Sequence, residues 1–180
     1  MGAPPDIVIR DCKASDLARI TEIYGQSVMR ETASFELEAP DLAEMTRRRS
    51  ALVEKDYPYL VAEREDVVVG YAYAGPHRPR PAYRHAVENT VYVDPAAQRR
   101  GVARALMERL IEEAQARGFR QMIAVIGDSA HIASIALHET LGFTRVGNLV
   151  SVGFKHGKWL DTVFMQRALG PGDATPPDGA

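Results

Sequence analysis

Apolar residues recur at two spacings along the chain, and each spacing predicts one kind of secondary structure. Recurrence every three to four residues predicts four amphipathic helices. Short runs rich in β-branched and aromatic residues predict seven strands. The helices are expected at residues 17–28, 41–53, 102–118 and 132–141, and the strands at 7–9, 59–65, 67–74, 87–93, 122–126, 143–153 and 159–168.

The second predicted helix has an apolar face and a basic face. Asp41 can cap its N-terminus. Arg47, Arg48 and Arg49 are expected to face solvent, because three charges cannot supply the basic surface that nucleic-acid binding usually needs. The residues expected to face inward are Leu42, Met45, Leu52 and Val53.

The order of the elements, β-α-α-β-β-β-α-β-α-β-β, predicts an α/β (α+β) fold with a mixed central sheet and helices on both faces. A helix separates residues 87–93 from 122–126, so these strands are expected to lie parallel through a right-handed crossover. The run at 122–126 is apolar throughout, as in a strand covered on both faces. One domain is expected over residues 7–169, between a flexible leader (1–6) and a disordered Pro/Gly-rich tail (170–180).

The composition is that of an ordinary soluble protein. Apolar residues make up 46% and charged residues 26%, and the net charge is −2, so there is no overall attraction to nucleic acid or to an anionic membrane. Cys12 is the only cysteine, which excludes an internal disulfide and a cysteine zinc site. No stretch resembles a signal peptide or a membrane span. These properties predict a cytoplasmic protein.

The most informative chemistry lies where the fourth strand meets the third helix. Asp94-Pro95 ends the strand, and Gln98-Arg99-Arg100-Gly101 follows before the helix. The first turn of a helix has unpaired N–H groups and the positive end of the helix dipole, and two arginines add charge, so a phosphate or pyrophosphate would bind well there. The motifs G-x-x-x-x-G-K-[ST] and G-x-G-x-x-G are absent from this position, which disfavours an ATPase or a dinucleotide enzyme.

A resemblance to a known family is carried by this junction and by several other stretches. Gln98-Arg99-Arg100-Gly101-Val102-Ala103 resembles the Q/R-x-x-G-x-G/A motif with which GNAT-superfamily N-acetyltransferases hold the pyrophosphate of acetyl-CoA. The other stretches resemble one branch, the phosphinothricin and methionine sulfoximine N-acetyltransferases. They are residues 57–63, 71–76, 88–93, 137–143 and 153–161, and the likeness runs in order from about Ile7 to Leu169.

The resemblance implies the GNAT fold, in which the parallel strand pair splays apart and the acyl-pantetheine arm of the cofactor lies in the gap. His131 stands where the family has an asparagine, and it can still donate a hydrogen bond. His131 and His138 share a helix face, but no third metal ligand is evident, so no metal is expected. The implied cofactor-binding residues are Val91, Tyr92, Val93, Gln98, Arg99, Arg100, Gly101, Val102, Ala103, Arg104, His131 and Ser134.

Glu88 and His138 are the candidate catalytic residues. On so apolar a strand, the Glu88 carboxylate is expected to be partly desolvated and able to take a proton from a substrate ammonium, directly or through one water. The alternative is an ion pair with Arg84 or Arg100. By resemblance, His138 stands where many family members have a tyrosine that protonates the departing thiolate. The alternative is a histidine that lies under its helix and bonds a carbonyl group.

The acceptor pocket is expected beside the base. Arg78 and Arg80 precede the strand of Glu88, and guanidinium groups suit carboxylate and phosphinate groups. A solvated basic loop is the alternative. The other residues expected to contact the acceptor are Phe35, Tyr73, Tyr83, Asn89 and Thr90.

Together these features imply an acetyl-CoA-dependent N-acetyltransferase that acts on the α-amino group of a small amino acid or analogue. Phosphinothricin, methionine sulfoximine and methionine sulfone are the acceptors implied by resemblance, and herbicide resistance would follow. Direct transfer in a ternary complex and a homodimer are expected. The alternatives are a non-catalytic module that senses acyl-CoA and an N-acetyltransferase for peptide N-termini. Polyamines are disfavoured as acceptors because they would prefer acidic pocket walls.

Overall fold

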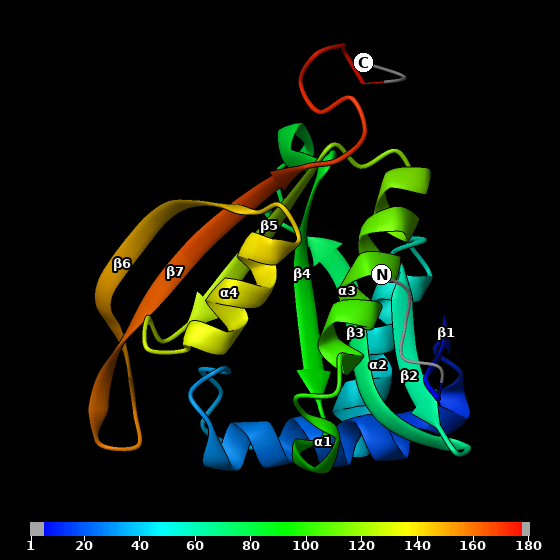
Figure 1. Cartoon of the computed structure of the whole chain (residues 1–180), viewed down its shortest axis with the longest axis vertical. Helices are drawn as coiled ribbons and strands as arrows, with labels where there is room; N and C mark the ends of the chain where they lie inside the picture. The colour runs from blue at the N-terminus through cyan, green and yellow to red at the C-terminus, as the bar shows by residue number, and fades with distance from the viewer. Residues whose placement is uncertain (1–5, 178–180) are drawn as a thin grey trace.

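One sheet of seven strands runs through the computed structural model, which describes residues 6–177 (Figure 1). The strands lie in the order β1-β2-β3-β4-β5-β7-β6. Neighbouring strands are antiparallel, apart from the parallel pair β4 and β5. The strands are β1 (Val8–Asp11), β2 (Tyr59–Arg64), β3 (Val67–Pro76), β4 (Ala86–Val93), β5 (Gln121–Gly127), β6 (Thr144–Lys155) and β7 (Lys158–Ala168).

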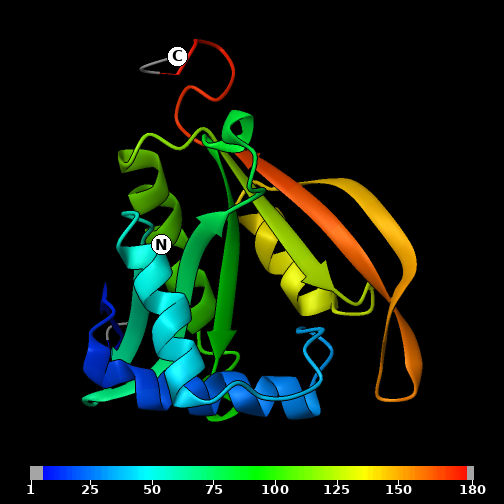
Figure 2. The same ribbon diagram turned by 180° about the vertical axis from the view of Figure 1, so that it is seen from behind.

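Helices cover both faces of this sheet. Helices α3 and α4 lie on the face turned to the viewer in Figure 1, whereas α1 and α2 lie on the opposite face, seen in Figure 2. The order of the elements and their two-sided arrangement confirm the predicted fold class. The helices are α1 (Leu17–Arg30), α2 (Leu42–Val53), α3 (Val102–Ala116) and α4 (Ile132–Thr140), and short 3₁₀ turns occur at Ala14–Asp16, Pro81–Tyr83 and Pro95–Ala97.

Each face of the sheet has its own hydrophobic core, and strand alternation assigns the residues of β4 to one or the other. Leu106 and Leu110 of α3 are fully buried on one face, as are Ile20 and Ile23 of α1 on the other. Tyr92 belongs to the α1 face, since its ring centroid lies 5.0 Å from that of Tyr24. The even-numbered residues of β4 therefore face α1 and α2, and the odd-numbered residues face α3 and α4.

The parallel strands β4 and β5 stay together over a short distance. Residues 86–88 of β4 pair with residues 121–123 of β5, and the two ribbons then diverge (Figure 1). On its other side β4 remains paired with β3 from Val87 to Val93. Beyond Glu88, the edge of β4 that faces β5 has no strand partner within the described chain. The splay that the resemblance implied is therefore present.

Three of the predicted side-chain orientations are wrong. Leu42 and Val53 are 47% and 42% exposed, because they lie in the terminal turns of α2, whereas Met45, nearer its middle, is buried. Val125 is 41% exposed although the strand was expected to be covered on both faces, because its side chain lies where β5 has left β4. An apolar pattern reports an element well, but it does not report where a neighbouring element ends.

The arginine triplet of α2 is more engaged than a solvated face would be. Arg47 is exposed, as expected. Arg48 donates to Glu36 at 2.6 Å and to Glu44 at 2.7 Å, and Arg49 donates to the backbone carbonyl oxygen of Cys12. Two of the three arginines thus tie α2 to neighbouring segments.

The predicted leader and tail fall partly outside the described residues, which exclude 1–5 and 178–180. In the described part of the tail, Arg120 donates hydrogen bonds to the backbone carbonyl oxygens of Gly172 at 2.8 Å and Thr175 at 2.5 Å. These contacts attach the chain after the sheet to the loop before β5. The domain limits of 7 and 169 stay predictions.

We expect Gly153→Ala to lower the free energy of unfolding by about 1–3 kcal/mol, as overpacking does. A Cβ atom built on Gly153 would overlap the ring of Phe35. Gly147→Ala is the matched control on the same strand, because a Cβ there meets no atom within 4 Å. Urea denaturation of both variants measures the difference. Equal stability of the two variants would contradict the packing of Phe35 against β6.

Candidate functional site

A groove of about 360 Å³ lies between the end of β4, the first turn of α3 and the first turn of α4. Its size is in the range usual for small-molecule sites. Eleven of the twelve predicted cofactor-binding residues line it, and Arg100 is the exception. Those eleven are Val91, Tyr92, Val93, Gln98, Arg99, Gly101, Val102, Ala103, Arg104, His131 and Ser134.

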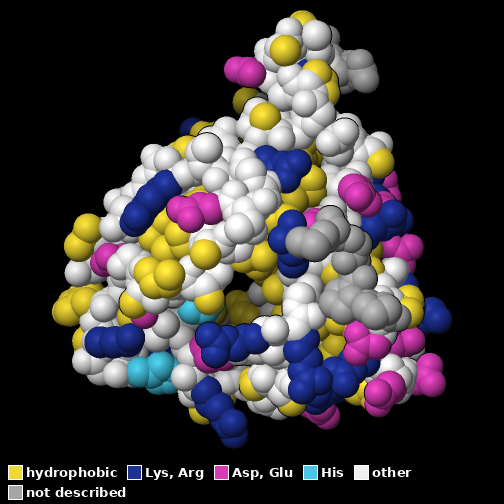
Figure 3. All heavy atoms as spheres, viewed as in Figure 1, with side chains coloured by type: hydrophobic (Ala, Val, Ile, Leu, Met, Phe, Trp, Pro, Cys, Tyr) yellow, Lys and Arg dark blue, Asp and Glu magenta, His cyan; other side chains and the backbone are white. Residues whose placement is uncertain are grey.

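The end of the groove at α3 is built to receive an anion. Gly101 is the N-cap of α3 and has a left-handed backbone, with φ of +80°, a conformation that glycine adopts without strain. The N–H groups of the first helical turn have no partner within the helix and point out of its N-terminus. Arg99 adds a positive charge at the rim of the groove. Figure 3 shows Lys and Arg side chains gathered beside a hollow near the centre of this face.

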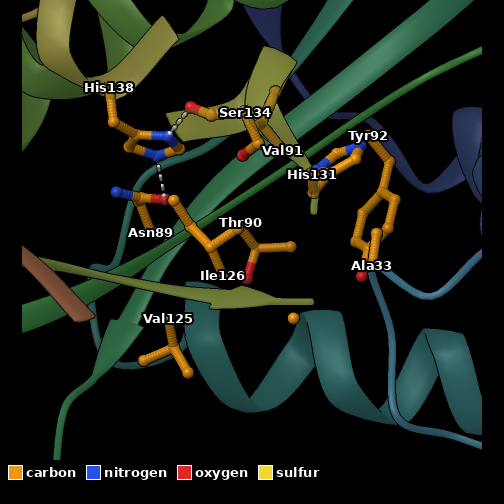
Figure 4. Close-up of a pocket in the computed structure, with 11 residues that line it drawn as sticks. Ala33, Asn89, Thr90, Val91, Tyr92, Val125, Ile126, His131, Ser134 and His138 are labelled. Atoms are coloured by element: carbon orange, nitrogen blue, oxygen red, sulfur yellow. Dashed lines mark hydrogen bonds between the residues drawn. The ribbon is translucent and has the colours of Figure 1, made fainter. Parts of the chain in front are cut away.

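A second, smaller cavity of about 90 Å³ occupies the gap between β4 and β5 (Figure 4). Asn89 and Thr90 line it from β4, and Val125 and Ile126 line it from β5. The two cavities share five lining residues, so they adjoin each other, and we call the pair the passage from the helix N-terminus to the middle of the sheet. The shared residues are Ala33, Val91, Tyr92, His131 and Ser134.

His138 lies at the inner end of this passage and is almost completely buried, with 2% of its surface exposed. Its Nδ1 is 2.8 Å from the carbonyl oxygen of Ser134, and its Nε2 is 3.2 Å from the side-chain amide of Asn89 (Figure 4). A carbonyl oxygen can only accept, so Nδ1 carries the proton. Burial lowers the pKa of His138, which favours the neutral ring. Nε2 is then an acceptor.

The side-chain amide of Asn89 can form a hydrogen bond with this neutral ring only when its nitrogen faces Nε2, because Nε2 is an acceptor. In one orientation of the amide, Oδ1 faces Nε2 and Nδ2 is buried without a hydrogen-bond partner among residues 6–177. The two amide atoms have nearly equal size and are assigned from the hydrogen-bond network. With the amide turned over, Nδ2 donates to Nε2 of His138. Both histidine nitrogens are then occupied, so His138 has no free N–H to give to a leaving group.

Glu88 lies at the last position at which β4 pairs with β5, at the edge of the gap, and it does not itself line either cavity. Its side chain is 35% exposed. Its partner is His77, whose Nδ1 lies 2.7 Å from Oε1; the predicted alternatives for that ion pair, Arg84 and Arg100, are not its partners. Because Glu88 and His138 belong to opposite faces of the sheet, they reach the gap from opposite sides.

The residues predicted for the acceptor pocket separate into two groups. Tyr73 and Thr90 lie opposite each other on β3 and β4, on the same face of the sheet as Glu88, and burial raises the pKa of the Tyr73 hydroxyl. Arg78, Arg80 and Tyr83 lie in the exposed loop between these strands. None of this second group lines the two cavities described above.

Phe35, expected in the pocket wall, instead anchors the loop between α1 and α2. Its ring fills a space over Gly127 of β5 and Gly153 of β6, and a Cβ built on Gly127 would come within 2.9 Å of that ring. The residue two positions before it, Ala33, lines both cavities. Phe35 therefore supports the site from outside.

Two further anchors of the same loop were missed in the sequence. The buried ammonium of Lys155 donates to the carbonyl oxygen of Ser34 at 2.6 Å, and burial lowers the pKa of Lys155. The hydroxyl of Thr32 donates to Asp128 at 2.9 Å. No local pattern marks these pairs, because their partners lie 121 and 96 positions apart in the chain.

His77 was also missed, although a signal for it exists. The antiparallel register pairs Pro76 with Val87. His77, the residue after Pro76, is thereby brought close to Glu88. Only the pairing register carries this information, and alternation of apolar residues does not fix a register by itself.

Across residues 6–177 no cluster of three or more His, Cys, Asp or Glu side chains could hold a metal ion. The same residues contain no helix that is long and apolar enough to cross a membrane. The expectation that no metal is needed stays a prediction.

Known proteins resemble this chain along nearly its whole length. Residues 22–143 match the Acetyltransferase (GNAT) family. A phosphinothricin N-acetyltransferase of Alcaligenes faecalis is 48% identical over 171 residues, which cover 95% of this chain and 85% of that protein. An L-methionine sulfoximine/L-methionine sulfone acetyltransferase of Salmonella typhimurium is 41% identical over 163 residues, which cover 91% of this chain and 95% of that protein.

A solved structure agrees with the fold in detail. It is a GNAT-superfamily phosphinothricin acetyltransferase from Sinorhizobium meliloti in complex with AcCoA. It superposes with a TM-score of 0.94 at 49% sequence identity, over 97% of this chain and 95% of that one.

We expect His138 to make the protein less stable as the pH falls. Above the ordinary histidine pKa of 6.5 the ring is neutral in both the folded and the unfolded chain. Below pH 6.5 the histidine of the unfolded chain binds a proton, whereas His138 of the folded chain stays neutral until the pH reaches its lowered pKa. The free energy of unfolding therefore declines between these two pH values. From about pH 7.5 to about pH 5, the wild-type protein should lose more stability than His138→Gln in urea denaturation. Parallel losses in the two proteins would exclude a neutral, buried His138.

Proposed function

Because the chain belongs to the acetyltransferase (GNAT) family, we propose that it transfers the acetyl group of acetyl-CoA to the α-amino group of a small amino acid or analogue. The observation that carries this proposal is the pair of adjoining cavities that lead from the N-terminus of α3 to the gap between β4 and β5. The names of the relatives suggest phosphinothricin, methionine sulfoximine and methionine sulfone as acceptors.

The groove suits coenzyme A at its two chemically distinct ends. The first turn of α3, with Arg99 beside it, offers N–H groups and positive charge to the diphosphate. The pantetheine arm would run along the free edge of β4, where main-chain groups of residues 91–93 need hydrogen-bond partners. His131, at the junction of the two cavities, would bond the arm in place of the asparagine of the family.

In the proposed reaction the acceptor enters from the α1 and α2 side, where Glu88 lies. The acceptor ammonium gives a proton to the Glu88 carboxylate, and the resulting amine attacks the thioester carbonyl carbon. A C–N bond forms, the C–S bond breaks, and the second amine proton goes to the sulfur. Main-chain N–H groups at the gap would stabilise the oxyanion.

The surroundings of His138 support a role in shaping the site more than a role as the acid. Its Nδ1 proton is bonded to Ser134, and its other nitrogen accepts from Asn89 in the neutral state. We propose that the sulfur takes its proton from the reacting amine instead. A covalent route through Cys12 is disfavoured, because burial raises the pKa of that thiol and Cys12 lies outside the groove.

The acceptor's anionic group would be held by Arg78 and Arg80, which are both exposed. Tyr73 and Tyr83 would wall the pocket. Because Phe35 anchors the adjoining loop, its effect on the acceptor would be indirect.

The two alternative functions require different features around the groove. A sensor of acyl-CoA would use the groove but need no base beside the gap between β4 and β5, so Glu88 speaks against it. An N-acetyltransferase for peptide N-termini needs room for a chain beyond the amine. A cytoplasmic location and a part in herbicide resistance stay predictions.

We propose a homodimer as well, supported by the outer strand β6. Its free edge and its neighbourhood expose many large apolar side chains, and such edges are commonly covered by a partner. The molar mass in solution tests this proposal, and a monomer at every concentration would exclude it. The exposed residues are Val146, Leu149, Val150, Val152, Phe154 and Trp159.

We expect the protein to release free thiol from acetyl-CoA in the presence of L-phosphinothricin or methionine sulfone. Glu88→Gln should lower kcat by about 100-fold or more, because general-base catalysis contributes about that much, with little change in the dissociation constant of acetyl-CoA. A thiol-reactive dye follows the reaction across a panel of amino acids, peptides and polyamines. Binding of acetyl-CoA without thiol release from any acceptor would favour the sensor.

We expect Arg99→Ala to weaken acetyl-CoA binding by about tenfold, the worth of one charge-assisted contact. Arg100→Ala is the matched control, since Arg100 is its neighbour but does not line the groove. Isothermal titration calorimetry measures both variants. A larger loss for Arg100→Ala than for Arg99→Ala would show that the diphosphate lies elsewhere.

A further inference from the structure

Within residues 6–177, the proposed base Glu88 makes one side-chain hydrogen bond, and its partner is His77. His77 follows the last residue of β3, and its backbone N–H bonds the carbonyl oxygen of Ala86 at 3.4 Å. This pairing extends the β3–β4 register by one step and sets the imidazole beside the carboxylate. Nδ1 of His77 then lies 2.7 Å from Oε1 of Glu88.

The contact makes the two oxygens of Glu88 unequal. An ionised carboxylate can only accept hydrogen bonds, so Nδ1 of His77 must carry the proton in the state that is ready to act as a base. Oε1 is occupied by this bond, and Oε2 makes no hydrogen bond with the described residues. One oxygen is thus fixed by the protein and the other is free to take a proton.

The imidazole is itself held in place. Tyr83 packs edge-on against it, with ring centroids 5.7 Å apart and an interplanar angle of 77°. The His77 side chain is 16% exposed, less than half the exposed fraction of Glu88. A carboxylate on a freely rotating side chain would lose rotamer freedom each time an acceptor bound, whereas a bonded one has already lost it.

We propose that His77 is a positioning residue that holds the Glu88 carboxylate by Oε1 and presents Oε2 to the acceptor ammonium. This inference rests on the proposed function, in which Glu88 is the base. One N–H bond of the ammonium breaks and an O–H bond forms at Oε2. The proton on Nδ1 stays where it is, so His77 acts by donating a hydrogen bond and takes no part in moving the proton.

Two substitutions separate hydrogen-bond donation from every other property of the imidazole. His77→Phe keeps an aromatic ring against Tyr83 and removes the donor, so kcat should fall by about tenfold or more while the dissociation constant of acetyl-CoA stays unchanged. His77→Asn restores an N–H at the position of Nδ1 but cannot relay a proton. It should recover most of the lost kcat. Should the Phe variant be poorly folded, as judged by acetyl-CoA binding, His77→Ala takes its place.

The role of His77 must depend on Glu88, and a double variant tests that dependence. In the Glu88→Gln background, His77→Phe should cause no further loss of kcat. A purely structural role would lower the activity of both backgrounds alike. His156→Asn is the control for replacing a histidine, because His156 lies on the exposed turn between β6 and β7.

Each outcome decides the matter in one direction. Wild-type kcat in His77→Phe, a loss in His77→Asn as large as in His77→Phe, or additive losses in the double variant would overturn the positioning role. If Glu88→Gln retains wild-type kcat, the proposed base fails and His77 loses its role with it. If Glu88→Gln is impaired while His77→Phe is not, the proposed function stands and this inference alone is wrong.

Discussion

The site depends on the early separation of two parallel strands. Strand β4 is paired with β3 along its length, so it stays extended, yet it is paired with β5 at three positions. Beyond these, its main-chain groups face open space in the middle of a sheet. Unpaired backbone groups are costly to bury, so a ligand that can form hydrogen bonds as a strand does would satisfy the groups that the fold leaves unpaired there. Both cavities exist because of this separation.

The fold was predictable because its signals are local. Helical spacing at residues 102–114 and β-branched runs such as 87–93 identified, in order, the α-helices and strands of the described chain. The errors arose where burial depends on a distant element. Val125 reads as a core residue but is exposed, since the strand that would have covered its edge has turned away. The predicted burial of Leu42 and Val53, at the two ends of α2, was wrong for a similar reason. Periodicity does not show how far the surface beneath a helix extends.

The groove and the surroundings of the proposed base differed in how well the sequence predicted them, for the same reason. The groove at α3 is made largely from one continuous stretch, residues 91–104, and was therefore found almost completely. The surroundings of the proposed base were not, because His77 reaches Glu88 through strand register. The anchors of the loop after α1 join residues about a hundred positions apart, and nothing in either local sequence indicates the other.

Those anchors bear on how selective the passage is for the length of an acyl chain. Ala33 stands in the wall shared by both cavities, and its immediate neighbours, Thr32 and Ser34, are tied to β5's loop and to β6. The wall cannot retreat without breaking bonds on both sides. A larger acyl group would therefore meet a wall that hydrogen bonds hold in place, beside a cavity of only about 90 Å³.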